Sequence, residues 1–178
     1  MERGRVYFPA MNLFILRHGI AVEPGTPGYE NDSERPLIPK GERRLRKAAA
    51  AMETLELSFD LILSSPLVRA RQTAEIVAGE LKLQEWLKFT DALIPGGDFQ
   101  VLVQELTGLK PVPESILLVG HEPSLSRFIS LLVSGDANAA AIQMKKGGLC
   151  KLQVGELLPG QCARLLWLLT PSQMELMA

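Results

Sequence analysis

The chain has 178 residues, 47% of them hydrophobic and 22% charged, and its formal net charge is −1. This composition is typical of an ordinary globular protein and excludes a disordered or fibrous chain; the net charge gives no global sign of a nucleic-acid or membrane-surface partner. The longest apolar runs are far shorter than the ~20 residues that cross a bilayer, so we expect neither nucleic acid nor a membrane as a partner.

The two cysteines, Cys150 and Cys162, are too few and too far apart for a disulfide framework or a four-ligand zinc site. We therefore expect a cytoplasmic protein. Residues 1–10 carry early positive charge, but Pro9 interrupts them and no small-residue cleavage site follows, so they are not typical of a signal peptide. We expect one domain at 11–178, preceded by a loose N-terminal extension at 1–10.

Short apolar runs alternate with helix-length amphipathic segments along the chain. The expected strands are 12–16, 59–65, 86–89, 115–120, 148–154 and 163–169. The expected helices are one that begins near Lys40, followed by 65–81, 99–108 and 124–135. This alternation favours an α/β fold with a mostly parallel central sheet.

The first two helices have distinct faces. The apolar positions of the first recur at helical spacing and are Leu45, Ala48, Ala49, Met52 and Leu55. We expect the charges of its basic run KGERRLRK (40–47) to form a solvated helix face, the alternative being a local basic patch. In the second helix, Ser65 is suited to cap the first turn and Pro66 to occupy it, and Arg69 is expected near the helix start, off the buried stripe.

Three polar motifs follow three of the expected strands. RHG (17–19) follows the first strand, SSPLVR (64–69) the second, and GHEP (120–123) the strand at 115–120. In an open α/β sheet, ligands bind beyond the carboxyl ends of the parallel strands. We therefore expect the three motifs to converge at one edge of the sheet.

The converging residues would place two arginines and both histidines of the chain in one pocket. They are Arg17, His18, Arg69 and His121. Buried unpaired charge is costly, so such a cluster implies an anion, and guanidinium groups match phosphate oxygens. A phosphoryl group is the simplest missing ligand, with bound phosphate or sulfate as its stand-in. Two histidines do not complete a zinc site, so we expect no metal.

The histidines then need roles. Positive neighbours should lower the pKa of His18 and keep its imidazole neutral, as a nucleophile requires. Gly19 would let the backbone turn sharply after it, and His121 would donate to phosphoryl oxygens that gain charge. Taken singly, His121 is more typical of a structural histidine and Arg69 of a surface helix residue; the functional interpretation depends on their convergence.

The ordered set of motifs resembles the histidine phosphatase superfamily, which also contains the phosphoglycerate mutases. RPLIPKG (35–41), SSPLVRARQTAE (64–75) and IPGGD (94–98) resemble in particular its small SixA-type phosphohistidine phosphatases. The resemblance implies a phosphoglycerate mutase-like three-layer sandwich with helices on both faces of the sheet. It also implies His18 as the phosphorylated nucleophile, Arg17, Arg69 and His121 as the phosphate pocket, and no cofactor.

The proton donor is less clear. Many relatives use a carboxylate after the third strand, and here Asp91 and Asp98 are the candidates, while Glu122 is an alternative that could simply be solvated. Imidazole is a far better leaving group than an alkoxide, so a weak acid favours phosphohistidine over phosphate esters. Arg35 has two alternative roles. It binds phosphate or substrate, or it pairs with Glu34 or Asp32 on the surface.

The sequence therefore predicts a phosphatase that takes a phosphoryl group from a protein phosphohistidine, as in signal transduction, and passes it through His18 to water. The alternatives are hydrolysis of small phosphate monoesters and a non-catalytic phosphate-binding module. No segment is long enough for a lid, so we expect an open, shallow site that accepts a phosphorylated protein or a small phosphorylated molecule.

Overall fold

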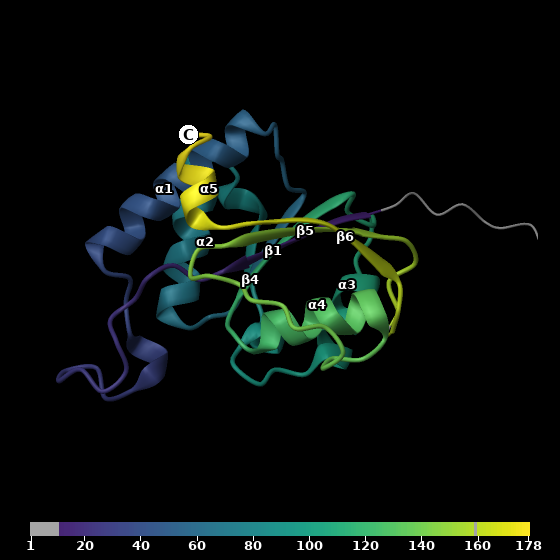
Figure 1. The fold of residues 1–178 in the computed structure, drawn as a ribbon, viewed down its shortest axis with the longest axis horizontal. Helices are drawn as coiled ribbons and strands as arrows, with labels where there is room; N and C mark the ends of the chain where they lie inside the picture. Colours follow the sequence, from purple (N-terminus) through teal and green to yellow (C-terminus); the bar gives the residue numbers. More distant parts are fainter. Residues whose placement is uncertain (1–10, 159) are drawn as a thin grey trace, which may run out of the picture.

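A mixed sheet of six strands runs through the centre of the computed structural model, which describes residues 11–158 and 160–178 (Figure 1). The strands are β1 (Met11–Arg17), β2 (Leu61–Ser64), β3 (Leu87–Phe89), β4 (Ser115–Gly120), β5 (Leu149–Val154) and β6 (Ala163–Leu169). Their order across the sheet is β3-β2-β4-β1-β5-β6. The strands β3, β2, β4 and β1 are mutually parallel, β5 is antiparallel to β1, and β6 is antiparallel to β5. The predicted extension at 1–10 lies outside the described residues.

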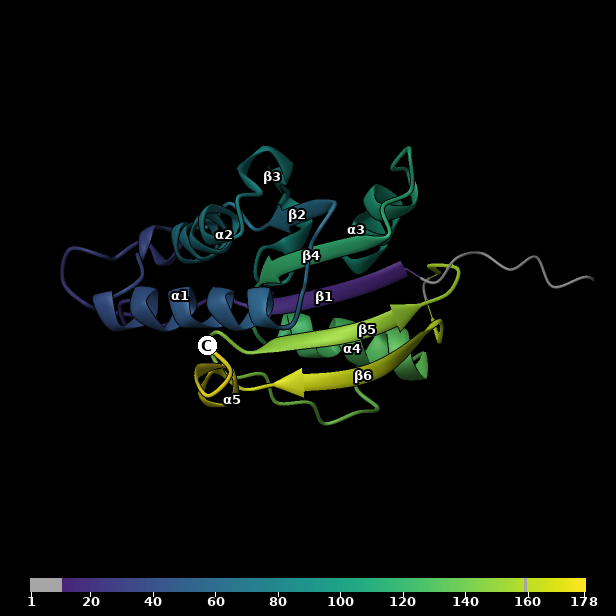
Figure 2. The same ribbon diagram turned by 90° about the horizontal axis from the view of Figure 1, so that it is seen from above.

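Helices cover both faces of this sheet. They are α1 (Pro39–Thr54), α2 (Val68–Glu80), α3 (Phe99–Thr107), α4 (Ser124–Ser134) and α5 (Pro171–Glu175), with short 3-10 turns at η1 (Asp32–Glu34), η2 (Gln84–Trp86) and η3 (Asp91–Leu93). Helices α1, α2 and α5 lie on one face and α3 and α4 on the other (Figures 1 and 2). The predicted three-layer α/β sandwich is confirmed.

The alternation of side chains along β1 divides the core into two layers. Leu13 and Ile15 pack in the cluster that contains α3 and α4, whereas Phe14 and Leu16 pack in the cluster that contains α1 and α2. A buried central strand needs apolar residues on both faces, which explains the unbroken apolar run that the sequence shows there.

The expected strands and helices are all present, but two details were wrong. Helix α1 ends at Thr54, and Leu55 is 39% exposed instead of buried. Helix α2 begins only at Val68, so Ser65 does not cap it and Pro66 lies before its first turn. The Ser65 hydroxyl accepts from the amide of Leu67 at 3.3 Å and also hydrogen-bonds to a histidine. The sequence reading also missed α5, although Thr170 forms a capping box with Gln173 at its start.

The basic run at the start of α1 mostly forms the expected solvated face. Arg43 and Lys47 are exposed, and Arg46 forms an exposed ion pair with Glu80. Arg44 differs, because its Nε donates to a carboxylate oxygen of Glu175 in α5 at 2.6 Å.

The entry to α1 is fixed by a close backbone contact. A Cβ atom on Gly41 would lie 2.1 Å from the carbonyl oxygen of Ile20. The amide of Ile38 donates to that same oxygen at 3.0 Å. Only glycine allows this approach, so Gly41 positions α1 against the segment that follows β1.

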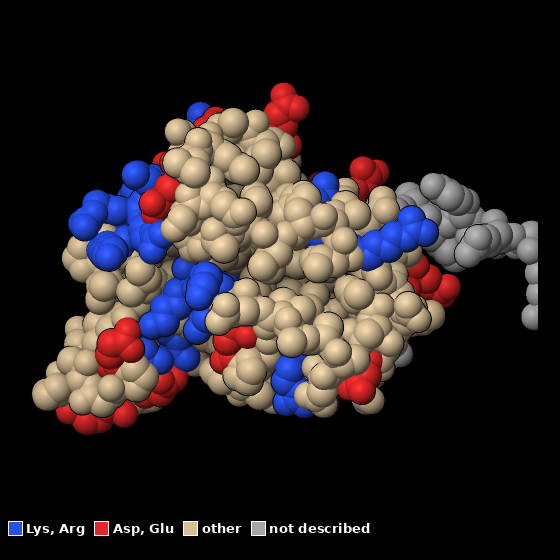
Figure 3. Space-filling model, in the orientation of Figure 1, with Lys and Arg blue, Asp and Glu red and all other residues tan. Residues whose placement is uncertain are grey.

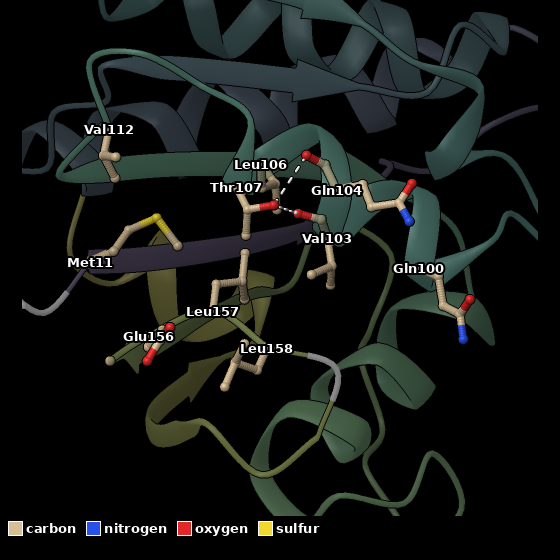
Figure 4. A pocket seen from close by; sticks show the side chains of 11 residues that line it. Met11, Gln100, Val103, Gln104, Leu106, Thr107, Val112, Glu156, Leu157 and Leu158 are labelled. Carbon is tan, nitrogen blue, oxygen red and sulfur yellow. Dashed lines mark hydrogen bonds between the residues drawn. The ribbon is translucent and has the colours of Figure 1, made fainter.

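A cavity of about 810 Å³ lies at the end of the sheet where β1 and β4 begin. Its wall is mostly apolar and includes Met11, Val103, Leu106, Val112 and Leu157 (Figure 4).

Candidate active site

The three polar motifs meet at the opposite end of the sheet, where β1, β2 and β4 finish. Arg17 pairs with Gly120 in the parallel register of β1 and β4. The amide of His18 donates to the carbonyl oxygen of Gly120 at 3.0 Å, and the amide of Ser65 donates to that of Val119 at 3.0 Å. The backbone thus joins the three motifs, as the sequence predicted. We call Arg17, His18, Arg69 and His121 the cluster.

His18 is held as a neutral imidazole with one free nitrogen. Its side chain is 6% exposed, and Nδ1 lies 2.8 Å from its neighbour's carbonyl oxygen, that of Gly19. A carbonyl only accepts, so Nδ1 carries the proton and Nε2 the lone pair. Burial is the main cause that lowers the pKa of His18 to about 3. The charges of His121, Arg69 and Arg17 lower this pKa further, and the hydrogen bond to Gly19 raises it. The direction agrees with the sequence argument, but burial is the larger cause.

Gly19 is needed because a side chain at this position would not fit, and not because of an unusual backbone conformation. Its φ lies outside the left-handed region, so no unusual backbone conformation requires glycine here. A Cβ atom here would lie 2.7 Å from Cδ1 of Leu45. The Gly19 amide donates to Oγ1 of Thr73 at 3.0 Å, and that hydroxyl donates to the carbonyl oxygen of Arg69 at 2.7 Å. Thr73, which sequence reasoning did not identify, thereby ties the nucleophile segment to α2.

His121 faces His18 from the neighbouring strand end. The ring centroids are 5.1 Å apart, and the His121 residue is 2% exposed. Its Nε2 lies 2.9 Å from Oγ of Ser65, the contact that replaces the predicted helix cap. Burial, followed by the charge of Arg69, lowers the pKa of His121 to about 3. Its Nδ1 is buried and has no partner among the described residues.

The two arginines are only partly satisfied. Nη1 of Arg17 donates to the carbonyl oxygen of Met144 at 2.7 Å. Nη1 and Nη2 of Arg69 donate to the carbonyl and to Oδ2 of Asp32, at 2.7 and 2.9 Å. Arg69 lies off the apolar stripe of α2, as predicted, but it is only 3% exposed and so is not a surface residue.

Three buried polar atoms lack a hydrogen-bond partner in the described part of the chain. They are Nε of Arg17, Nε of Arg69 and Nδ1 of His121. Buried polar groups are normally paired, and each exception needs an explanation. All three belong to the cluster, and the two arginine atoms are hydrogen-bond donors. An anion bound there would satisfy them.

Arg35 forms the edge of the site through Asp32. Its Nε and Nη2 donate to Oδ1 of Asp32 at 2.9 and 2.7 Å, while Oδ2 of the same carboxylate accepts from Arg69. Burial opposes ionisation of Asp32, but the two guanidinium groups prevail and hold its pKa below the ordinary value. The ion pair between Arg35 and Asp32 therefore exists, but Arg35 is buried beside the cluster and not on the surface. Phosphate binding by Arg35 stays a prediction.

Among the residues that the structure describes, the candidate proton donors form no hydrogen bond to the cluster, although the charge of Glu122 acts on Arg17 and opposes the lowering of its pKa by burial. Asp98 accepts from the amide of Gln100 at 2.7 Å and caps α3. Glu122 accepts from the amide of Ser126 at 3.0 Å in the first turn of α4. Asp91 is exposed at the start of η3. Across the described residues, none of these carboxylates hydrogen-bonds to a side chain of the cluster.

Access to the cluster is narrower than the sequence suggested. Both histidine rings are nearly buried, and the segment that carries Asp32 folds over Arg69. The buried cluster is therefore not the open, shallow site that the sequence predicted. Within residues 11–158 and 160–178, no group of three or more His, Cys, Asp or Glu side chains is arranged to hold a metal ion, and no helix is long and apolar enough to cross a membrane.

Comparison with known proteins identifies the class. Residues 13–93 match the profile of the histidine phosphatase superfamily (branch 1). An uncharacterised protein of Picosynechococcus sp. is 36% identical over 146 residues, which cover 82% of this chain and 86% of the relative. The phosphohistidine phosphatase SixA of Escherichia coli K12 is 30% identical over 127 residues, covering 71% and 76%.

A solved structure agrees with these sequences. The protein histidine phosphatase SixA in complex with tungstate superposes with a TM-score of 0.78 at 26% identity, covering 91% of this chain and 98% of the other. The chain therefore belongs to the histidine phosphatase superfamily and is a phosphatase. Within the superfamily it is of the SixA type, as its motifs predicted.

Proposed function

We propose that the enzyme is a phosphohistidine phosphatase, which removes the phosphoryl group from a histidine side chain of a protein through a phosphorylated His18. The single observation that carries this proposal is the state of His18: its Nδ1 is bonded to the Gly19 carbonyl, so the lone pair of Nε2 is available for attack. The low pKa of this ring keeps it unprotonated throughout the physiological range.

In the first step, Nε2 of His18 attacks the phosphorus atom, so an N–P bond forms to the enzyme as the N–P bond of the substrate breaks. Nε of Arg17 and Nε of Arg69 are the unpaired donors that would bind the phosphoryl oxygens. The substrate imidazole, whose other ring nitrogen has already taken a proton from solvent, leaves as a neutral ring and needs no proton donor on the enzyme. In the second step, water attacks the phosphorus atom, the bond to His18 breaks, and the water proton leaves with phosphate.

His121 would act on the phosphoryl group and not on the leaving group. If Nε2 of its ring accepts from the Ser65 hydroxyl, then Nδ1 carries the proton and is left as a donor for an oxygen that gains charge. The hydrogen bond to Ser65 fixes the orientation of the His121 ring, so we assign Ser65 as a positioning residue for this step.

The arrangement of carboxylates supports a nitrogen-linked substrate. Asp98 caps α3, Glu122 accepts from the amide of Ser126, and Asp91 is exposed. A phosphate ester needs a proton for its alkoxide, whereas neutral imidazole leaves readily without one. The E. coli relative is named a phosphohistidine phosphatase, and the tungstate-bound neighbour is named a protein histidine phosphatase.

The test compares three substrates. Two are peptides of similar size, one with phosphohistidine and one with phosphoserine at the same position, and the third is para-nitrophenyl phosphate. We expect kcat/KM to be much higher for the phosphohistidine peptide. Faster hydrolysis of the esters would instead support the alternative, a phosphatase of small phosphate monoesters. A rapid alkaline quench with labelled phosphate, followed by peptide mapping, should place the label on His18, and binding without turnover would indicate a non-catalytic module.

We also propose that the enzyme acts in signal transduction in the cytoplasm. Cys150 is buried and Cys162 half-buried, and both are free thiols, as a reducing compartment permits. Localisation of a tagged full-length chain in cell fractions tests this directly.

A further inference from the structure

The site is bordered by a basic surface that its chemistry does not use, formed by Arg44, Lys145 and Lys146. We propose that this basic surface binds acidic side chains next to the phosphohistidine of the partner protein and so selects the partner. The inference rests on the proposed function, because the occupant must carry the histidine that enters the cluster.

Backbone hydrogen bonds hold the two lysines close to the nucleophile. The amide of Gly147, directly after Lys146, donates to the carbonyl oxygens of both Arg17 and His18 at 3.0 Å. The amide of Arg17 donates to the carbonyl oxygen of Gly148 at 3.1 Å, and its Nη1 donates to that of Met144 on the other side of the lysines. The lysines therefore lie on a segment fixed to the reactive motif at both ends.

The basic surface lines a hollow that reaches the cluster. This hollow has a volume of about 590 Å³, and its lining includes Arg17, Arg44, Lys145 and Lys146 together with the hydroxyl residues Thr170 and Ser172. Figure 3 shows a band of Lys and Arg side chains on this face, between the surface over α1 and α5 and that over α4. Arg17 belongs to both the hollow and the cluster, so the two sites are continuous.

The charges in the hollow are not balanced internally. Arg44 pairs with Glu175 at 2.6 Å, and Lys146 pairs at 3.1 Å with Glu23, whose side chain is 70% exposed. The pair of Lys146 with the exposed Glu23 is weak and easily exchanged for another, whereas the side chains of Arg44 and Glu175 are only 30% and 27% exposed. Lys145 is exposed and has no carboxylate within 4.0 Å among the described residues. Because the whole chain has a net charge of −1, this excess of positive charge is local.

The shape of the hollow and its charge favour an acidic protein surface. The phosphoryl group must enter a nearly buried cluster, whereas Lys145 stands in solvent beside it. A partner that presents phosphohistidine can therefore place neighbouring Asp or Glu side chains on the lysines during the same encounter. Complementary charge at the mouth of a site accelerates such encounters by about 10- to 1,000-fold at low ionic strength.

Two synthetic peptides test the proposal. They are identical except that the residues flanking the central histidine are Glu in one and Gln in the other, and the histidine is phosphorylated with phosphoramidate. At low salt, we expect kcat/KM of the wild-type enzyme to be about tenfold higher for the Glu peptide. The double variant Lys145→Gln/Lys146→Gln should reduce this ratio to near one, and Lys110→Gln, at the far end of the sheet, should preserve it.

Added salt should lower the ratio in the wild-type enzyme because it screens exposed charges. If the double variant loses stability, Lys145→Gln alone breaks no ion pair and should still lower the ratio. Equal hydrolysis of the two peptides by the wild-type enzyme, or an unchanged ratio in the lysine variants, would overturn the docking surface alone. If the wild-type enzyme hydrolyses neither peptide but does turn over para-nitrophenyl phosphate, the proposed substrate is wrong and the docking surface with it.

Discussion

At the end of the sheet where β1, β2 and β4 finish, polar side chains are buried around unpaired donor atoms. At the other end, where β1 and β4 begin, a cavity of about 810 Å³ is lined mostly by apolar side chains. Cavity size alone would direct attention to the second region, since binding sites are commonly large apolar pockets. We propose that the chemistry takes place in the first.

The difference teaches which observation is informative in a phosphatase of this type. A phosphoryl group is small, so its site needs little volume, but it needs several donors that water cannot reach. Three buried atoms without partners at one end, all from the cluster, indicate such a site more clearly than a wide hollow does. The following variants separate the roles of the two ends.

Replacement of the nucleophile should have the largest effect. His18→Ala removes the atom that forms the covalent intermediate, so we expect kcat to fall by at least about 1,000-fold. The far-UV circular dichroism spectrum should stay that of the native fold, which shows that chemistry and not folding is lost. Retention of substantial turnover by a folded His18→Ala enzyme would refute the covalent route.

Loss of a phosphate-binding guanidinium should follow. Arg69→Ala removes a buried donor, and we expect kcat/KM to decrease by about 100-fold, with weaker binding of vanadate in a competition assay. Arg71→Ala is the matched control, because Arg71 lies on the same helix but its pair with Glu75 is loose, at 3.8 Å, and exposed. Equal effects of the two variants would mean that Arg69 does not bind the phosphoryl group.

The apolar end should respond in stability and not in activity. Leu106 is 3% exposed in the core beside the cavity, and Leu106→Ala should lower the free energy of unfolding by about 3 kcal/mol. Urea denaturation measures this loss, and kcat/KM of the folded variant should equal that of the wild type. A selective loss of activity instead would connect the cavity to catalysis.

A smaller change in stability is expected at the entry to α1. Gly41→Ala forces a Cβ against the carbonyl oxygen of Ile20 and should destabilise the fold by about 1–3 kcal/mol. Gly79→Ala in α2 is the control, because a Cβ there meets nothing within 4 Å; it should be neutral or stabilising by up to about 1 kcal/mol. Thermal melts of the two variants should therefore shift in opposite directions, or only the Gly41 variant should shift.

The smallest change is expected in the imidazole resonances of the folded protein. His18 and His121 both have a pKa of about 3 because of burial, so their ¹⁵N signals should not titrate between pH 8 and pH 5. The unfolded chain has ordinary histidines with a pKa near ~6.5, so it binds more protons in that range. The contribution to stability is therefore present above about pH 6.5 and decreases as the pH falls toward 3. Titration of either ring near pH 6.5 would show that the ring is solvated.

Most of the fold could be predicted from the sequence, because the spacing of apolar residues and the position of a motif after a strand can both be recognised within a short segment. The apolar runs at β1, β2 and β4 and the helical stripes of α1 and α2 specified the layers. Helix α5 was missed because it has only five residues, too few for a periodic pattern. The convergence of the three motifs followed from a general rule of parallel sheets.

The supporting contacts of the site could not be predicted, because each joins residues distant in the chain. Thr73 contacts Gly19, and Ser65 contacts His121. The residues of each pair are more than 50 positions apart in the chain, so no local sequence pattern predicts these contacts. Serine before a helix is usually a cap, and only the late start of α2 frees the hydroxyl for another role. Asp32 was considered as a surface partner of Arg35, but its second bond, to Arg69, depends on tertiary structure.

The pairing of β1 with β4 and β5 has a consequence for how this protein acquires its activity. The reactive motif gains its backbone partners only when segments more than a hundred residues further along the chain have docked on either side of it. Contacts of such long sequence separation form slowly, since loop closure must precede them. Recovery of turnover after dilution from denaturant should therefore lag behind the recovery of helical circular dichroism, and a ribosome-bound nascent chain should stay inactive until β5 has emerged.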